Sequence, residues 1–176
     1  AFAPADINQY TLPEGIIKIG DFVFCLCNEL ESITLSNGVT TIGDQAFFAS
    51  ENLKSVTLSE SVTHIGFSAF YNCVSLSDIE LKKVTNIDDN AFCGCSSLTE
   101  ITIPASVHSI GADAFSTCNK LAAVYCKPTV PPVAETSSFS NNATGRKIYV
   151  PRNTEQIYKQ SKGWSAYTSA IEPYDF

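Results

Sequence analysis

The stretch Leu35 to Thr57, LSNGVTTIGDQAFFASENLKSVT, sets the pattern for most of this 176-residue chain, because the same 23-residue pattern returns on both sides of it. The copies are LPEGIIKIGDFVFCLCNELESIT from Leu12, the stretch above from Leu35, LSESVTHIGFSAFYNCVSLSDIE from Leu58, LKKVTNIDDNAFCGCSSLTEIT from Leu81 and IPASVHSIGADAFSTCNKLAAVY from Ile103. A fixed period of this length indicates a stack in which each copy is one structural unit.

Alignment of the copies places one type of apolar residue in each of several rows. The rows are Leu30, Leu53, Leu76, Leu98 and Leu121; Ile33, Val56, Ile79, Ile101 and Val124; Ile19, Ile42, Ile65, Ile87 and Ile110; and Phe24, Phe47, Phe70, Phe92 and Phe115. Because each stacked copy buries the same positions, each row is expected to form a ladder in the core.

The consensus L-P-x-x-V-x-x-I-G-x-x-A-F-x-x-C-x-x-L-x-x-I resembles the BspA-type leucine-rich repeats of bacterial surface and secreted proteins. The resemblance covers roughly Ile7 to Pro151, and the tail that follows resembles the C-terminal end of such proteins. It implies a right-handed leucine-rich-repeat solenoid with a parallel β-sheet on its concave face. A second row of short strands and 3₁₀ or helical turns would lie on the other side, with a helical cap at the C-terminus.

The repeat frame predicts one domain over residues 1–176, made of a partial repeat (1–11), five repeats (12–125), a degenerate repeat (126–151) and a cap (152–176). Counting back puts Ala1 in mid-repeat, and an open solenoid end needs a cover. We therefore expect either further sequence upstream or a fold of residues 1–6 over the first repeat. The chain has no Met, which is consistent with a signal peptide or anchor removed before residue 1.

Within each copy, L-x-x-I-x-L predicts a short strand, and V-x-x-I-G predicts a second, more irregular one. The glycines at the end of that second segment are expected to take positive φ or a tight turn, and Asp88 replaces one of them as a residue that tolerates the left-handed region. The segment that follows, such as Asp44 to Phe47, predicts one helical or 3₁₀ turn that directs the Phe inward. The first-segment strands are expected at Ile7, Leu30, Leu53, Leu76, Leu98, Leu121 and Ile148, and the glycines are Gly20, Gly43, Gly66 and Gly111.

The tail after Pro151 predicts a cap of two short helical pieces over the last repeat. Asn153 is a good N-cap residue, with Gln156 three residues later as in a capping box. Trp164 lies among large apolar residues, and an aromatic carbohydrate platform around it is the alternative interpretation.

Composition excludes several function classes. A net charge of −7 and a pI near 4.7 argue against nucleic-acid binding, which needs a basic face. The sequence contains no run of 18 or more apolar residues of the kind that spans a membrane.

The seven cysteines follow the repeat. Residues in one ladder are spaced about 4.8 Å apart with parallel Cβ vectors, whereas a disulfide needs Cβ atoms about 3.8 Å apart. The same parallel arrangement disfavours a tetrahedral zinc site at Cys93 and Cys95. Small buried apolar side chains are the favoured interpretation, and no metal or cofactor is expected.

No catalytic group is apparent in the sequence. His64 and His108 occupy different repeat positions two copies apart, at places expected to face solvent. Neither a G-x-S-x-G nor an H-E-x-x-H motif occurs, so we expect no catalytic, cofactor-binding or metal-binding residues.

Surface residues on the predicted strands are the remaining candidates. The two positions that flank the inward Ile form two outward rows, which supply the extended binding face of a solenoid. Asp78, Glu80 and Glu100 place like charges on neighbouring strands, and Lys54, Lys82 or Lys83 could offset them; a merely tolerated patch is the alternative. The candidate partner-binding residues are Ser55, Thr57, Asp78, Glu80, Glu100, Thr102 and Tyr125.

Two functional hypotheses from different classes remain open. The resemblance implies a non-enzymatic binding module, secreted or displayed on a bacterial surface, that mediates protein binding or adhesion to host or matrix proteins. The alternative is a structural spacer or array segment of a larger surface protein. The sequence identifies neither the partner nor the oligomeric state.

Overall fold

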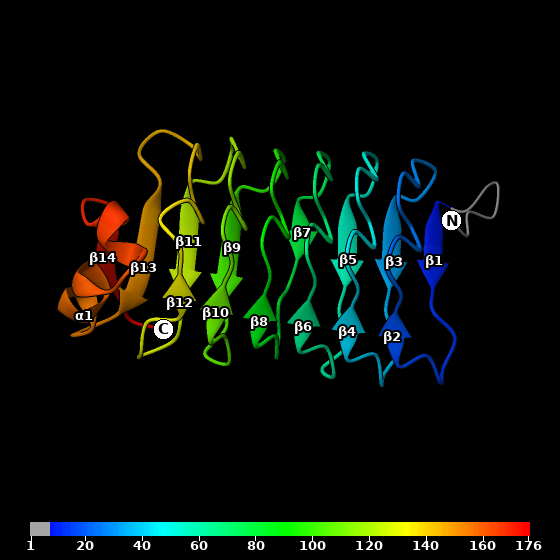
Figure 1. The fold of residues 1–176 in the computed structure, drawn as a ribbon, viewed down its shortest axis with the longest axis horizontal. Coiled ribbons are helices and arrows are strands. Elements are labelled where there is room, and N and C mark those ends of the chain that lie inside the picture. The colour runs from blue at the N-terminus through cyan, green and yellow to red at the C-terminus, as the bar shows by residue number, and fades with distance from the viewer. Residues whose placement is uncertain (1–7) are drawn as a thin grey trace.

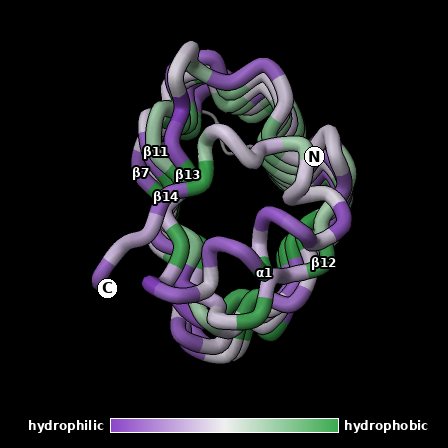
Figure 2. The backbone as a smooth tube through the Cα atoms, turned by 90° about the vertical axis from the view of Figure 1, so that its left-hand side faces the viewer, coloured by the Kyte–Doolittle hydropathy of each residue, from purple (hydrophilic) through white to green (hydrophobic). Residues whose placement is uncertain are grey.

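The computed structural model of the chain describes residues 8–176, which wind into a solenoid whose coils, called rungs below, stack along one axis (Figure 1). Viewed along that axis, the coils superimpose around one interior, and the two rows of strands lie on opposite sides (Figure 2). The expected fold of residues 1–6 over the first rung lies outside the described residues.

The first row contains the seven parallel strands that the sequence predicts, plus one more. The additional strand β14 (Ile171–Tyr174) pairs with β13 and places Ile171 beside Ile148, so the 23-residue spacing continues into the tail. The predicted strands are β1 (Gln9–Thr11), β3 (Ser32–Thr34), β5 (Ser55–Thr57), β7 (Asp78–Ile79), β9 (Glu100–Ile103), β11 (Ala123–Cys126) and β13 (Lys147–Pro151).

The second row is one continuous parallel sheet of six two-residue strands, five in the segments that the copies predict and the sixth, β12, in the degenerate repeat. Its members are β2 (Lys18–Ile19), β4 (Thr41–Ile42), β6 (His64–Ile65), β8 (Asn86–Ile87), β10 (Ser109–Ile110) and β12 (Val133–Ala134).

The glycines that end the second-row strands show one of the two expected conformations. None of them has a positive φ, and neither has Asp88, so that alternative is wrong. The tight turn is confirmed at Gly43, Gly66 and Gly111, whose carbonyls accept from the N–H three residues later, for example Ala46 N to Gly43 O at 3.3 Å. Close stacking is a further reason for glycine here. A Cβ built on Gly43 would lie 2.9 Å from the carbonyl carbon of Gly20, and one on Gly111 would lie 2.4 Å from the backbone nitrogen of Asp89. The absence of a side chain therefore lets successive rungs approach each other.

Left-handed residues occur instead two positions before and two positions after the stacked Phe of each of the five full copies. Around Phe47 they are Gln45 (φ 53°) and Ala49 (φ 51°), and around Phe70 they are Ser68 and Asn72. Single left-handed residues interrupt an α-helix or 3₁₀-helix. The segment is accordingly a run of hydrogen-bonded turns and replaces the expected helical or 3₁₀ turn.

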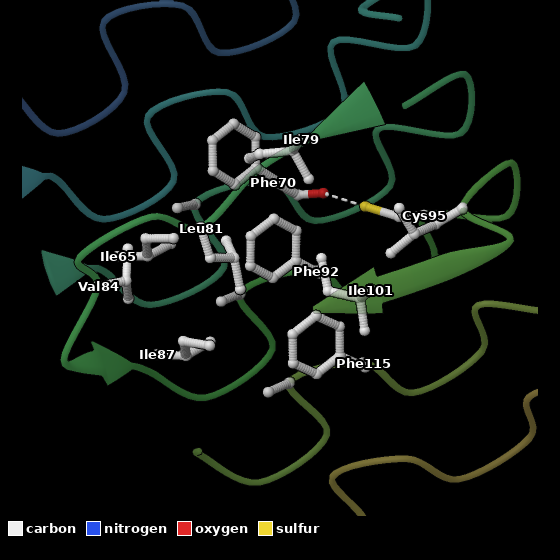
Figure 3. Close-up of a cluster of buried hydrophobic side chains, with 14 of the residues drawn as sticks. Ile65, Phe70, Ile79, Leu81, Val84, Ile87, Phe92, Cys95, Ile101 and Phe115 are labelled. Carbon is white, nitrogen blue, oxygen red and sulfur yellow. Dashed lines mark hydrogen bonds between the residues drawn. The ribbon is translucent and has the colours of Figure 1, made fainter. Parts of the chain in front are cut away.

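The Phe row forms the centre of the core, as predicted. Neighbouring rings stack nearly parallel, with 5.0 Å between the centroids of Phe47 and Phe70 and 5.1 Å between those of Phe70 and Phe92. Figure 3 shows Phe70, Phe92 and Phe115 in line among the buried aliphatic rows. The stack extends beyond the five predicted copies to Phe139 in the degenerate repeat.

A ladder of side-chain hydrogen bonds runs beside the Phe stack: each Phe carbonyl from Phe24 to Phe115 accepts from the following rung, and that of Phe139 accepts from its own rung. Most donors occupy the cysteine position of the repeat, and Figure 3 shows the bond from the Cys95 thiol to the Phe70 carbonyl. The cysteines there are buried and free, as expected, and they also act as donors. The bonds are Ser50 Oγ to Phe24 O (2.6 Å), Cys73 Sγ to Phe47 O (3.0 Å), Cys95 Sγ to Phe70 O (3.2 Å), Cys118 Sγ to Phe92 O (3.2 Å), Asn142 Nδ2 to Phe115 O (2.7 Å) and Arg146 Nη1 to Phe139 O.

The C-terminal segment covers the last rung with α1 (Glu155–Gln160), the short 3₁₀ helix η1 (Trp164–Tyr167) and strand β14. Asn153 is not the N-cap: it takes φ 71° as the chain leaves β13, and Thr154 occupies the cap position. Trp164 is fully buried and donates its indole N–H to Pro132 O at 2.8 Å. Its burial excludes the carbohydrate platform.

Candidate interaction face

The candidate residues project from the first strand row, on the face that we call the first-row face. Pairing in the sheet sets them side by side, with Ser55 opposite Asp78 and Thr102 opposite Tyr125. Thr57 follows Ser55 on β5, and Glu80 lies directly after β7. Asp78, Glu80, Glu100 and Thr57 are exposed, whereas Ser55, Thr102 and Tyr125 are half-buried.

The first strand row is interrupted between β7 and β9, in the middle of this face. The four strands from β1 to β7 form one sheet and the four from β9 to β14 form another. Ile79 on β7 is 8% exposed, whereas its row neighbours Val56 and Ile101 are 3% and 2% exposed, so the inward residue at the interruption is covered slightly less than its neighbours.

Two features of the sequence account for the interruption. The copy from Leu81 is one residue short in the turn after β7, and β7 has only two residues. Asp78 and Glu100, moreover, occupy equivalent repeat positions on its two sides, where like charges oppose close pairing. The second row and the Phe stack continue past this point, so the interruption of strand pairing is confined to the first-row face.

The carboxylates at the interruption lack ion-pair partners among residues 8–176. Lys54 pairs with Glu31 at 2.8 Å, and Lys82 pairs with Glu60 at 3.7 Å. Two of the lysines that could offset the acidic residues therefore bind elsewhere. Asp78, Glu80 and Glu100 form the acidic cluster of this face, and no ion pair among the described residues includes them.

Beyond Glu100 the face becomes aromatic. Tyr125 stacks on Tyr149 with ring centroids 5.0 Å apart, and the ring of Tyr174 meets both at 5.4 Å. Phe176 packs against Tyr174, and the ammonium of Lys127 lies 5.9 Å from the centroid of the Phe176 ring. Burial, the charge of Glu100 and the neighbouring tyrosines raise the pKa of Tyr125.

Acidic and aromatic groups meet at a hollow of about 380 Å³, called the Tyr125 slot below. Its position follows from side-chain size: Thr102 lies opposite Tyr125 in the sheet and is too small to cover the ring, whereas Tyr149 stacks on the ring from the other strand. The residues that line the slot are Glu100, Thr102, Tyr125, Lys127, Tyr174, Asp175 and Phe176.

The histidines lie away from this face. His108 is exposed as expected, but His64 is half-buried and its Nε2 lies 3.1 Å from Asp88 Oδ2 of the next rung. Burial raises the pKa of Asp88 although His64 acts in the opposite direction. No group of three or more His, Cys, Asp or Glu side chains in residues 8–176 has the geometry of a metal site.

Three residues of the slot, Glu100, Thr102 and Tyr125, are among the candidates that the sequence predicts, and the other four are not. Tyr149, which supports the slot by stacking on Tyr125, could have been predicted, because it follows the inward Ile148 just as Tyr125 follows Val124. Tyr174 and Phe176 enter through β14, whose spacing fits the repeat although its sequence, IEPY, lacks the consensus residues.

Comparison with known proteins agrees with this geometry. The sequence matches the BspA type leucine rich repeat region with six copies, over residues 1–122 and 69–163. No curated protein matches significantly in sequence. No helix in residues 8–176 is both long and apolar enough to cross a membrane.

Solved structures of similar fold come from several bacteria. A leucine rich repeat protein of T. pallidum is 26% identical with a TM-score of 0.66, over 81% of this chain and 71% of that one. A leucine rich cell surface protein of Faecalibacterium prausnitzii is 26% identical with a TM-score of 0.65, over 96% of this chain and 48% of that one.

The pneumococcal vaccine antigen PcpA shares the fold at 19% identity, with a TM-score of 0.75, and this chain spans 40% of its length. The family match covers well over half of the residues, and the fold agrees with it. This chain belongs to the BspA-type leucine-rich-repeat family.

Proposed function

We propose that the chain is a non-enzymatic binding module, secreted or displayed on a bacterial surface, which docks a protein partner on the first-row face. The family and the cell-surface description of the Faecalibacterium structure support the class of function and the location. A host matrix or cell-surface protein is the partner that this class favours.

The observation that carries the proposal is the unpaired acidic cluster. Some carboxylates elsewhere on the surface pair with cations, for example Glu31 with Lys54 and Glu135 with Lys162. Others, such as Glu29 and Glu51, have no ion pair among residues 8–176, but they lie on exposed turns and not on neighbouring strands of one face. Asp78, Glu80 and Glu100 find none among residues 8–176, although they share one face and meet at the interruption of the sheet. A basic partner surface would offset their mutual repulsion and be steered toward this face.

The test compares three proteins for binding to a panel of purified matrix and host-surface proteins. The first is the wild type, and the second carries Asp78→Ser, Glu80→Thr and Glu100→Ser, which are residue types already present in these rows. The control carries Glu14→Ser, Glu29→Ser and Glu51→Ser, which remove the same charge from exposed turns.

We expect the wild type and the control to bind one panel member alike, and the acidic-cluster variant to bind roughly tenfold more weakly, with an affinity that falls as salt is added. Equal binding by all three proteins, without salt dependence, would remove the acidic cluster from the function.

A rigid spacer is the second candidate function, and the uninterrupted Phe stack from Phe24 to Phe139 favours it. A spacer needs an extended, stiff body and no specific partner. Failure of every panel member to bind, together with small-angle scattering that shows one rigid rod in solution, would favour this role over the binding module.

A further inference from the structure

We propose that the Tyr125 slot accepts an arginine side chain of the protein partner. The inference deepens the proposed function, on which it rests, by naming the chemical group that the first-row face recognises. It depends on the slot alone, so it can be tested with a small probe before any partner is known.

The aromatic wall of the slot offers an open ring face. Tyr149 covers one side of the Tyr125 ring, whereas the other side lies over Thr102, which is too short to fill the space. Tyr174 packs edge-on against Tyr125 and holds the ring in place. A planar guanidinium group stacks on such a face by cation–π attraction.

The acidic group of the slot stands beside that face. Glu100 precedes Thr102 by two residues on the same strand, so both side chains project from the same side of the sheet. Its carboxylate is exposed and has no cation partner among residues 8–176. An arginine stacked on Tyr125 would have N–H groups free to donate to Glu100, since guanidinium carries five donors in one plane.

The slot already holds a cation of its own. The Lys127 ammonium lies 5.9 Å from the centre of the Phe176 ring, at the side of the slot formed by the C-terminal segment. The other acidic residue of the slot, Asp175, is occupied by Arg152 through two hydrogen bonds of 2.8 and 2.7 Å. Glu100 is therefore the free carboxylate for an incoming cation, and Lys127 would weaken its binding by repulsion.

A sugar is the competing occupant, because aromatic faces and carboxylates also bind carbohydrate. The charge pattern favours the cation. Asp78 and Glu80, on the rung before Glu100, extend the negative surface, and the whole chain carries a net charge of −7. Such a surface attracts a cationic ligand over a neutral one.

The experiment is an NMR titration of the isotope-labelled chain with blocked Gly-Arg-Gly tripeptide. Blocked Gly-citrulline-Gly, which keeps the planar shape but lacks the charge, is the matched control, and a methyl glucoside tests the sugar alternative. We expect shifts at Glu100, Thr102 and Tyr125 with the arginine peptide and none with the other two compounds.

Three variants test the roles of the side chains. Glu100→Gln keeps the shape of the slot, and we expect it to weaken arginine binding roughly tenfold. Glu51→Gln makes the same charge change on an exposed turn and should leave binding unchanged. Lys127→Gln removes the competing cation and should strengthen binding about twofold.

Equal binding of the arginine and citrulline peptides would overturn the inference. It would also be overturned if Glu100, Thr102 and Tyr125 shifted only with the glucoside, or with none of the compounds. Failure of the slot is distinguishable from failure of the proposed function. A chain that ignores arginine but still loses its partner through the acidic-cluster substitutions retains the docking face and lacks the arginine slot.

Discussion

The thiol ladder predicts how the stability of the fold responds to alkali. Cys73 and Cys118 are fully buried, and burial raises the pKa of each thiol from 9.0 to about 12. An unfolded chain would ionise these thiols from about pH 9, whereas the folded chain keeps them protonated. The raised pKa therefore favours the folded state below pH 9, and this contribution is lost as the pH rises toward 12.

The size of the effect follows from proton linkage. Between about pH 8 and pH 10.5, a thiol with these two pKa values lowers the free energy of unfolding by about 2 kcal/mol. The two thiols together lower the free energy of unfolding by about 4 kcal/mol over this pH interval. The chain itself supplies the matched replacement, because Ser50 occupies the same repeat position and donates to Phe24 O at 2.6 Å.

The assay is urea unfolding of the wild type and of a Cys73→Ser, Cys118→Ser variant at both pH values, with reductant present. We expect the wild type to lose about 4 kcal/mol more than the variant across this interval. Any offset between the two proteins at the lower pH cancels, as do the ionisable groups that these two thiols do not influence; Cys95, whose pKa both thiols raise, is the exception. An equal loss in both proteins would show that these thiols are not held protonated by the fold, and would refute the reasoning.

Three further predictions concern packing. Phe70→Ala is expected to lower the free energy of unfolding by about 3–5 kcal/mol, since the ring is fully buried in the stack. Phe67→Ala is the control and should change this free energy far less, because Phe67 is 42% exposed. Equal effects of the two substitutions in chemical denaturation would contradict the stacking. Gly43→Ala should cost about 1–3 kcal/mol, because its Cβ would meet the backbone of the preceding rung, and an unchanged unfolding midpoint would count against this close approach. Trp164→Ala should lower the free energy of unfolding by about 3–5 kcal/mol and expose the end of the Phe stack. Amide hydrogen exchange should then accelerate in the last rung before it does elsewhere. An equal acceleration in all rungs would argue against the role of Trp164 as a cap.

Most of the fold could be predicted from the sequence because the repeat states the same information many times. The Phe row, the two strand rows and the burial of five of the seven cysteines all follow from one alignment, whereas Cys25 and Cys93, expected to be buried, are only half-buried. The φ angle of Gly43 could not be predicted in this way, since a positive φ and a close contact between rungs both favour glycine. The turns around Phe47 differ for a related reason: pairing with the next rung, not local propensity, sets their φ angles.

The candidate face was predicted in position but not in shape. The outward rows follow from the alternation of side chains in a strand, which places Asp78, Glu100 and Tyr125 correctly on one face. The interruption after β7 depends on one missing residue and on charge repulsion between neighbouring rungs. Aligning the copies does not show whether these two effects are large enough to break the strand pairing. The slot depends on β14, which brings Tyr174 to Tyr125 from outside the consensus repeats.

The Phe carbonyl ladder makes the length of this protein adjustable in whole copies. Each copy brings one acceptor and one donor, and the donor serves the copy before it, as Cys95 serves Phe70. Insertion or deletion of a complete internal copy therefore leaves every carbonyl matched, whichever of Ser or Cys stands at the donor position. The final acceptor is different, because Phe139 relies on Arg146 from its own rung. A longer or shorter relative can thus be assembled from the middle of the chain, provided that this last rung and its arginine stay at the end.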